Sequence, residues 1–162
     1  MYLDVTVPTA TPFLACYLPY VLRKADQTLS APFYAVLTQH GVARSEWRVL
    51  AVLHEFGDLT IAELAADSLS PQPTVTHALT RLERRGLIQR TLGTADKRQR
   101  IASITPAGAE LTDQLITEAQ RLETNALSQA GDLSGLLDEL TQLTMLVEAN
   151  VAATELQDAG LT

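Results

Sequence analysis

Residues 60–106 read TIAELAADSLSPQPTVTHALTRLERRGLIQRTLGTADKRQRIASITP and contain two helix patterns followed by a pattern of alternating residues. Thr60 and Glu63 have the spacing of a capping box, which predicts the start of a short helix. Ser70, followed by proline, combines an N-cap with a proline of the first turn, so a second helix is expected to open there and to end at Gly86. After this glycine the apolar residues alternate, which predicts two short strands around a polar tip.

Two capped helices followed by a hairpin are the outline of a winged helix-turn-helix, a module whose second helix lies in the DNA major groove. The second helix has a single apolar stripe, formed by Val75, Ala78, Leu79 and Leu82. The expected fold is therefore mainly α with a small β-hairpin wing, and the module is expected to lie between dimerisation helices.

The N-terminal flank shows apolar residues at spacings near three, four and seven, which is typical of a helix. Thr11 and Pro12 predict its start, as an N-cap and the first helical residue. Pro19 and Pro32 interrupt the pattern, so a kink or a break is expected at each of them. Gly41 is expected to end this helix.

The remaining helices are also predicted from caps and apolar spacing. Ser45 can cap the helix that leads into the module, Thr105 caps a long helix after it, and a last helix starts near Leu133. The chain is therefore divided into an N-terminal arm and dimerisation helix, a DNA-binding domain and C-terminal dimerisation helices, at 1–44, 45–106 and 107–162.

Composition narrows the class of protein. A chain of 162 residues with 46% hydrophobic residues can form one domain with helical extensions. Its single cysteine excludes an intramolecular disulfide and fits a reducing compartment. The first twenty residues hold no lysine or arginine, and the apolar run around Phe13 is too short to cross a bilayer. A cytoplasmic protein with no membrane partner is expected.

The formal net charge of −7 conceals a basic segment. Between Arg81 and Arg100 there are seven basic and two acidic residues, a balance of +5, and the rest of the chain carries −12. Because screening confines the field of a charge to about 8 Å at physiological salt, a basic patch on an acidic body can still bind phosphate.

Hydrogen-bonding side chains occupy the face of the second helix opposite its apolar stripe. Such side chains recognise base edges and phosphates, and the arginines and lysine of the wing suit a phosphate or a narrow minor groove. The residues predicted to contact double-stranded DNA are Ser70, Gln72, Thr74, Thr76, His77, Arg81, Lys97, Arg98 and Arg100.

Three motifs in this region resemble those of the MarR family of bacterial transcription regulators. Residues 79–90 read LTRLERRGLIQR, residues 96–100 read DKRQR, and residues 104–111 read ITPAGAEL. They correspond to the family patterns Leu-Glu-x-x-Gly-Leu-x-x-Arg, Asp-x-Arg and Leu-Thr-x-x-Gly, except that Ile104 replaces the usual leucine. The resemblance covers roughly residues 41–115 by motif and the flanking helices by layout.

The resemblance implies a triangular homodimer that reads a palindromic promoter site, most often as a repressor. It implies that Asp96 and Arg98 are the acidic and basic members of the wing motif. His77 stands where the family often has arginine, which leaves the operator sequence open.

The family resemblance also implies release from DNA by a small phenolic or anionic effector, bound between the dimerisation helices and the DNA-binding domain of residues 45–106 (the reader). The aromatic and cationic residues expected there are Tyr20, Arg23, Tyr34, Trp47, Arg48 and His54. Packing in the core or the dimer interface is the competing interpretation for Tyr20 and Trp47.

Cys16 allows a second kind of sensing. One branch of the family detects organic hydroperoxides with a reactive cysteine near this place, assisted by tyrosines, and Cys16 with Tyr20 resembles part of that arrangement. No further tyrosine stands near Leu29 or Arg44, so a small buried hydrophobic role is preferred for this cysteine.

Other function classes have little support. The histidines are scattered, no zinc-ligand spacing occurs, and neither a phosphate-binding glycine loop nor a hydrolase motif is present. No enzyme activity, metal or cofactor is therefore expected. A winged-helix protein–protein adaptor that does not bind DNA is the remaining alternative.

Overall fold

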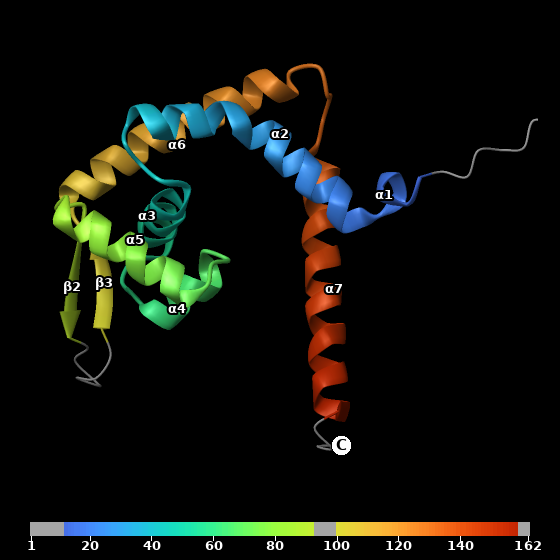
Figure 1. The fold of residues 1–162 in the computed structure, drawn as a ribbon. Helices are drawn as coiled ribbons and strands as arrows, with labels where there is room; N and C mark the ends of the chain where they lie inside the picture. Colours follow the sequence, from blue (N-terminus) through green and yellow to red (C-terminus); the bar gives the residue numbers. More distant parts are fainter. Residues whose placement is uncertain (1–11, 93–99, 159–162) are drawn as a thin grey trace, which may run out of the picture. The chain divides into compact units, whose positions relative to one another are not determined.

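The computed structural model describes residues 12–92 and 100–158 (Figure 1). The chain divides into two units, Met1–Thr124 and Asn125–Thr162, and the boundary falls within the sixth helix. The helices are α1 (Phe13–Cys16), α2 (Leu18–Gln39), α3 (Arg44–Phe56), α4 (Ile61–Asp67), α5 (Gln72–Arg84), α6 (Pro106–Leu127) and α7 (Ser134–Asp158). The strands are β1 (Leu59–Thr60), β2 (Ile88–Leu92) and β3 (Arg100–Ile104).

The predicted caps of α4 and α6 are confirmed. The backbone N–H of Thr60 donates to the Glu63 carboxylate at 2.8 Å, and the Glu63 N–H donates to the Thr60 hydroxyl at 3.3 Å. The bond from the Thr60 N–H, together with the Thr60 hydroxyl, which donates to the same carboxylate at 2.7 Å, lowers the pKa of the Glu63 carboxyl below its ordinary value. At α6, the Gly108 N–H donates to the Thr105 hydroxyl oxygen at 3.1 Å.

The predicted caps of α3 and α5 are wrong by one or two residues. The N-cap of α3 is Ala43, whose N–H donates to the Glu46 carboxylate at 2.8 Å, and Ser45 lies inside the helix. The N-cap of α5 is Pro71, and Ser70 instead donates its hydroxyl to the carbonyl of Ser68 at 2.9 Å. Neither α3 nor α5 has a side-chain hydrogen bond from its N-cap residue.

The N-terminal helix breaks once, at the first of its two internal prolines. Tyr17 is extended between α1 and α2, and Pro19 lies in the first turn of α2, where no backbone donor is needed. Pro32 causes no break, because α2 runs through it to Gln39. Pro12, expected as the first helical residue, is the N-cap of α1.

Two helices of the reader end in the left-handed backbone region. Gly86 follows α5 with φ 69°, and the Leu87 N–H reaches back to the carbonyl of Leu82 at 3.0 Å. Leu69 takes the corresponding position after α4 with φ 50°, and its side chain is 87% exposed. The turn between α4 and α5 is thereby tight without a glycine.

The sheet has three antiparallel strands in the order β1-β3-β2, one more than the predicted hairpin. Strands β2 and β3 pair from Ile88 opposite Ile104 to Leu92 opposite Arg100. Strand β1 adds a pairing of only two residues to β3, and two residues are too few to show a periodicity in sequence.

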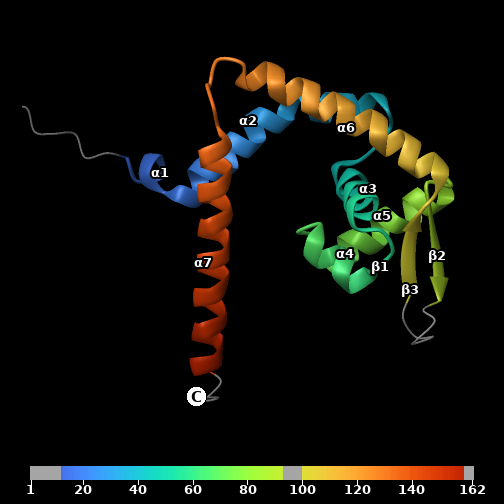
Figure 2. The same cartoon turned by 180° about the vertical axis from the view of Figure 1, so that it is seen from behind.

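The first unit holds two groups of buried apolar side chains. In the reader, the predicted stripe of α5 packs with residues from α3, α4 and the sheet, among them Leu50, Leu53, Leu64, Ile88 and Ala102. The second group joins α2 to α6 through Phe33, Leu37, Val42 and Leu115. In Figures 1 and 2, α6 runs along the C-terminal half of α2. Leu111 of α6 packs against both groups, so side-chain packing connects α2 and α6 to the reader.

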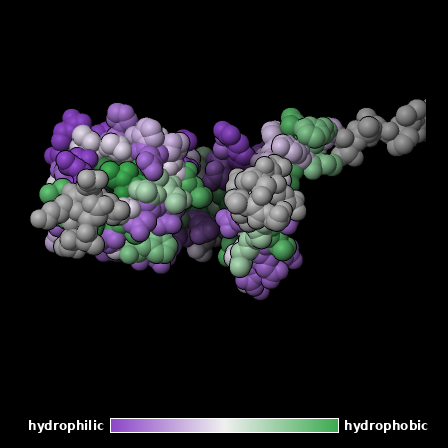
Figure 3. All heavy atoms as spheres, turned by 90° about the horizontal axis from the view of Figure 1, so that it is seen from below, coloured by the Kyte–Doolittle hydropathy of each residue, from purple (hydrophilic) through white to green (hydrophobic). Residues whose placement is uncertain are grey.

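Apolar side chains stay exposed on α1, on the start of α2 and on α7. Phe13 and Leu14 of α1 are exposed. Figure 3 shows hydrophobic residues on the surface next to one of the grey segments. In the second unit, α7 exposes Leu137 and Leu146 among others. Within the described parts of the chain, no helix is long and apolar enough to cross a membrane.

Candidate DNA interface and effector pocket

Helix α5 presents a polar face because its other face is fully used by the core. The four residues of its apolar stripe are at most 2% exposed. On the opposite side Gln72, Thr74, Thr76, His77 and Arg81 are all exposed. The structure therefore places the predicted reading residues of the helix on one accessible surface, apart from Ser70, which is half-buried in the preceding turn.

Arg81 has a protein partner that the sequence did not reveal. Its Nε atom lies 2.8 Å from Oε1 of Glu46 on α3, and the Glu46 side chain is 1% exposed. Arg85 approaches the same carboxylate at 3.6 Å. In the sequence, Glu46 is recognisable only as an acidic residue in the first turn of a helix that has no side-chain N-cap. That pattern does not indicate a partner on another helix.

The basic hairpin is attached to α5 through Arg90. The Arg90 Nε donates to Oε2 of Glu83 at 3.0 Å, and this hydrogen bond lowers the pKa of the Glu83 carboxyl. Within the basic segment, Arg90 therefore has a structural role, since it ties β2 to α5. Arg100 is exposed at the start of β3, opposite Leu92. Lys97 and Arg98 lie outside the described residues.

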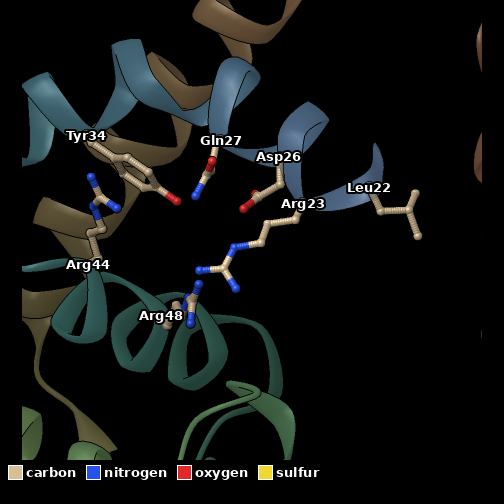
Figure 4. Close-up of a pocket in the computed structure, with 7 residues that line it drawn as sticks. All are labelled: Leu22, Arg23, Asp26, Gln27, Tyr34, Arg44 and Arg48. Atoms are coloured by element: carbon tan, nitrogen blue, oxygen red, sulfur yellow. The ribbon is translucent and has the colours of Figure 1, made fainter. Parts of the chain in front are cut away.

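An open pocket of about 500 Å³ lies between α2 and α3 (Figure 4). Arg23, Asp26, Gln27 and Tyr34 project into it from α2, and Arg44 and Arg48 face it from α3. Leu22 completes the lining. Three arginines against one aspartate leave a formal charge of +2, and the volume is within the range of small-molecule sites, about 300–1,000 Å³.

One wall of the pocket is arranged by a cation–π contact. The guanidinium carbon of Arg44 lies 3.6 Å from the centre of the Tyr34 ring. Such stacking orients the planar guanidinium and leaves its edge donors available. A flat, anionic molecule would match the combination of arginine donors and an aromatic face.

The pocket contains only some of the predicted effector residues. Arg23, Tyr34 and Arg48 line it, whereas Tyr20, Trp47 and His54 do not. Trp47 packs edge-on against Phe33 with ring centres 5.0 Å apart, beside the buried group that joins α2 to α6. His54 lies 2.9 Å from the carboxylate of Asp113 on α6, which directs it away from the pocket.

Cys16 is exposed at the end of α1, so its expected role as a small buried hydrophobic residue is wrong for the single chain. Tyr17 beside it stacks on Phe13 at 4.9 Å. The redox role of Cys16 stays a prediction.

The described residues contain no group of three or more metal-ligating side chains.

Comparison with known proteins identifies the family. The sequence profile of the MarR family matches residues 42–99. A MarR family transcriptional regulator from Silicibacter pomeroyi DSS-3 is 32% identical, with a TM-score of 0.70 over 83% of this chain and 99% of that one. NadR in complex with 4-hydroxyphenylacetate is 26% identical, with a TM-score of 0.72 over 86% of this chain and 97% of NadR.

A relative with a shorter match is the transcriptional regulator FarR of Neisseria gonorrhoeae. It is 31% identical over 94 residues, which are 58% of this chain and 64% of FarR. The chain thus matches slightly less than two thirds of the length of FarR. The profile match, the Silicibacter relative and the three-stranded winged fold agree, and the chain belongs to the MarR family of winged helix-turn-helix transcription regulators.

Proposed function

We propose that the protein is a homodimeric repressor that binds a palindromic promoter site and is released by a small anionic effector. The observation that carries the DNA-binding part is the exposed polar face of α5, held in place by a fully buried apolar stripe and followed by a basic hairpin. A helix in this position reads base edges with its N-terminal residues, and the hairpin contacts phosphate or the minor groove. Gln72, Thr74, Thr76 and His77 are assigned to the bases, and Arg98, Lys97 and Arg100 to the DNA backbone or minor groove.

The dimeric state is supported by apolar surface that a single chain leaves open. Exposed apolar residues recur along α1, the start of α2 and α7, outside the reader. Exposed apolar surface of this kind marks an interface, and a two-fold dimer is the commonest way to bury it. Residues 1–44 and 107–162 are therefore assigned to dimerisation. A two-fold dimer presents two α5 helices to two half-sites, which accounts for a palindrome, and the bound dimer excludes other proteins from the promoter.

The effector is assigned to the pocket between α2 and α3. Its charge of +2 favours a carboxylate or a phenolate, and the Tyr34 ring favours a planar group. NadR, which shares the fold at 26% identity, has been solved with the aromatic carboxylate 4-hydroxyphenylacetate. This likeness supports the same class of ligand for the present chain.

Both walls of this pocket are connected to α5. Arg85 at the end of α5 donates to the carbonyl of Gly41 at 2.8 Å and to that of His40 at 3.3 Å, at the end of α2. Glu46 connects α3 to Arg81 of α5. A ligand that changes the spacing of α2 and α3 can therefore shift α5 and reduce its fit to the groove, which is the proposed route to release.

DNA binding is expected to weaken steeply with salt. Because each neutralised phosphate contributes a slope of about −0.9 to the logarithmic dependence of affinity on salt, binding to a duplex enriched from a random pool should show a slope of several units. Arg98→Ala is expected to weaken binding to all sequences and to reduce this slope. Gln72→Ala is expected to change the base preference and to leave the slope unchanged. Electrophoretic mobility shift or fluorescence anisotropy measures both quantities.

The control for this experiment is Arg121→Gln on α6, which removes a positive charge that is already paired with Glu118 and lies outside α5 and the wing. It should leave the affinity and the slope at their wild-type values. Affinity that does not depend on salt would contradict binding through the basic segment, and a protein that binds no duplex would favour the adaptor alternative.

Arg48→Gln is expected to raise the concentration of 4-hydroxyphenylacetate needed to release DNA by about tenfold, because a charge-assisted hydrogen bond to the carboxylate is lost. Release is followed by anisotropy of a labelled duplex, with Arg121→Gln again as the matched control. If Arg48→Gln responds as the wild type does, the ligand is bound elsewhere. A wild type that is not released at all would exclude aromatic carboxylates of this kind.

A further inference from the structure

The most unusual charged group of the reader is Glu46, in the first turn of α3. Its side chain is 1% exposed, although an ionised carboxylate is costly to remove from water unless it is paired and hydrogen-bonded. Helix α3 lies between the effector pocket, which Arg44 and Arg48 face, and α5, which Glu46 faces. Capping of a helix alone would not require this degree of burial.

The two carboxylate oxygens of Glu46 have different partners. Oε2 accepts the Ala43 N–H at 2.8 Å and lies 3.6 Å from Nη1 of Arg85. Oε1 is buried and accepts no hydrogen bond of good geometry, so its charge is compensated by Nε of Arg81 at 2.8 Å. Arg81 is thus held at its Nε atom by a carboxylate from a different helix.

Arg81 is held without being covered, since its side chain remains 59% exposed. A contact at Nε leaves both terminal nitrogens of the guanidinium for another partner. His77 lies three residues after Thr74, and Arg81 lies four residues after His77, so the three exposed residues form one row on the reading face of α5. An arginine fixed at Nε can direct its planar fork at a phosphate or at a guanine edge.

We propose that Glu46 is a positioning residue for DNA binding, which holds the Arg81 guanidinium so that its free edge faces the DNA. This inference rests on the DNA-binding function proposed above. Glu46 is acidic and lies on α3, outside α5, yet the proposal gives it a favourable effect on DNA binding. Other roles of Glu46 lead to different results when its charge is removed.

Charge alone predicts that Glu46→Gln strengthens binding, because a negative charge near the DNA surface is lost. A purely structural role predicts that Glu46→Gln weakens binding whether or not Arg81 is present. Positioning predicts that the loss depends on Arg81. Glutamine keeps the length of the side chain and an oxygen that can accept the Ala43 N–H, so this substitution removes mainly the charge.

The experiment is a double-mutant cycle with Glu46→Gln, Arg81→Gln and the double variant, measured on a duplex that the wild-type protein enriches from a random pool. Glu46→Gln is expected to weaken binding about tenfold, as is Arg81→Gln, because each loses the oriented contact. The double variant should bind within about twofold of Arg81→Gln, since the two residues act as one unit. Circular dichroism and thermal unfolding of the free proteins establish that the variants are folded.

Three outcomes would overturn the proposal: wild-type affinity for Glu46→Gln, tighter binding by that variant, or a double variant that shows the product of both losses. If Glu46→Gln does not fold, Arg81→Lys gives the answer, because lysine keeps the charge and lacks both Nε and the fork. It should weaken binding with an unchanged salt slope, and wild-type affinity would contradict positioning. A wild-type protein that enriches no duplex would contradict the proposed function itself, which separates the two failures.

Discussion

Replacement of Gly108 by alanine is expected to lower the free energy of unfolding by about 1–3 kcal/mol, the cost of overpacking a tight contact. A Cβ atom at this position would lie 2.0 Å from the carbonyl oxygen of Leu87 and 2.9 Å from the Ile104 side chain. The carbonyl has little freedom to move, because it accepts the Thr105 N–H at 3.1 Å. Chemical denaturation followed by circular dichroism measures the effect.

The matched control is Gly135→Ala in α7, where a Cβ atom would meet nothing within 4 Å. Alanine is the better helix former, so this variant should be as stable as the wild type or more stable. Equal stability of Gly108→Ala and the wild type would show that the start of α6 does not rest on the turn after α5. It would also remove the structural reason for the glycine of the third sequence motif.

Replacement of Leu79 by alanine is expected to cost about 2–5 kcal/mol of stability, as for other fully buried leucines. Leu79 is completely buried in the core of the reader, on the face of α5 opposite to the predicted reading residues. The cavity left by the side chain removes packing that holds α5 in position, so DNA affinity should fall as well. Thermal unfolding and the binding assay on the enriched duplex measure the two effects.

Leu69→Ala is the control for this prediction. Leu69 is two residues before the end of the α4–α5 turn at Pro71, and its side chain is 87% exposed. Because alanine leaves the backbone as strained as leucine does at φ 50°, only exposed side-chain surface is lost, and stability should change by no more than about 0.5 kcal/mol. A comparable loss of stability in both variants would contradict the prediction, because it would mean that the burial of these side chains in the single chain differs from their burial in solution.

The order of elements in the reader was predictable from local signals. The capping box at Thr60, the stripe of α5, the stop at Gly86 and the start of α6 after Thr105 are all confirmed. Each depends on residues three or four positions apart, which stay neighbours in any helix.

The starts of α3 and α5 could not be predicted from the same kind of signal, and their N-caps are Ala43 and Pro71 in place of Ser45 and Ser70. Each serine has the right chemistry for a cap, but Glu46 and the carbonyl of Ser68 provide the competing hydrogen bonds. Which bond forms depends on the path of the chain around the cap, and residue type does not determine that path.

The lining of the proposed effector pocket was only partly predictable. The arginines at 23 and 48 and the tyrosine at 34 were identified by residue type, and the structure adds Arg44 through its stacking on Tyr34. Trp47 and His54 were chosen for the same reason and lie elsewhere, because helix rotation turns them toward Phe33 and Asp113. Rotation of a helix about its axis is set by packing against its neighbours.

The sequence by itself therefore determined the family, the helix-turn-helix and the polar face of α5, since these follow from motifs and from the helical repeat. The tertiary structure alone decided that Glu46 and Arg81 form a pair, that α2 and α3 enclose a cationic pocket, and that Gly108 rests against Leu87. These are contacts between elements far apart along the chain. No local pattern specifies them, because they exist only once the shared core has set the position and rotation of each helix.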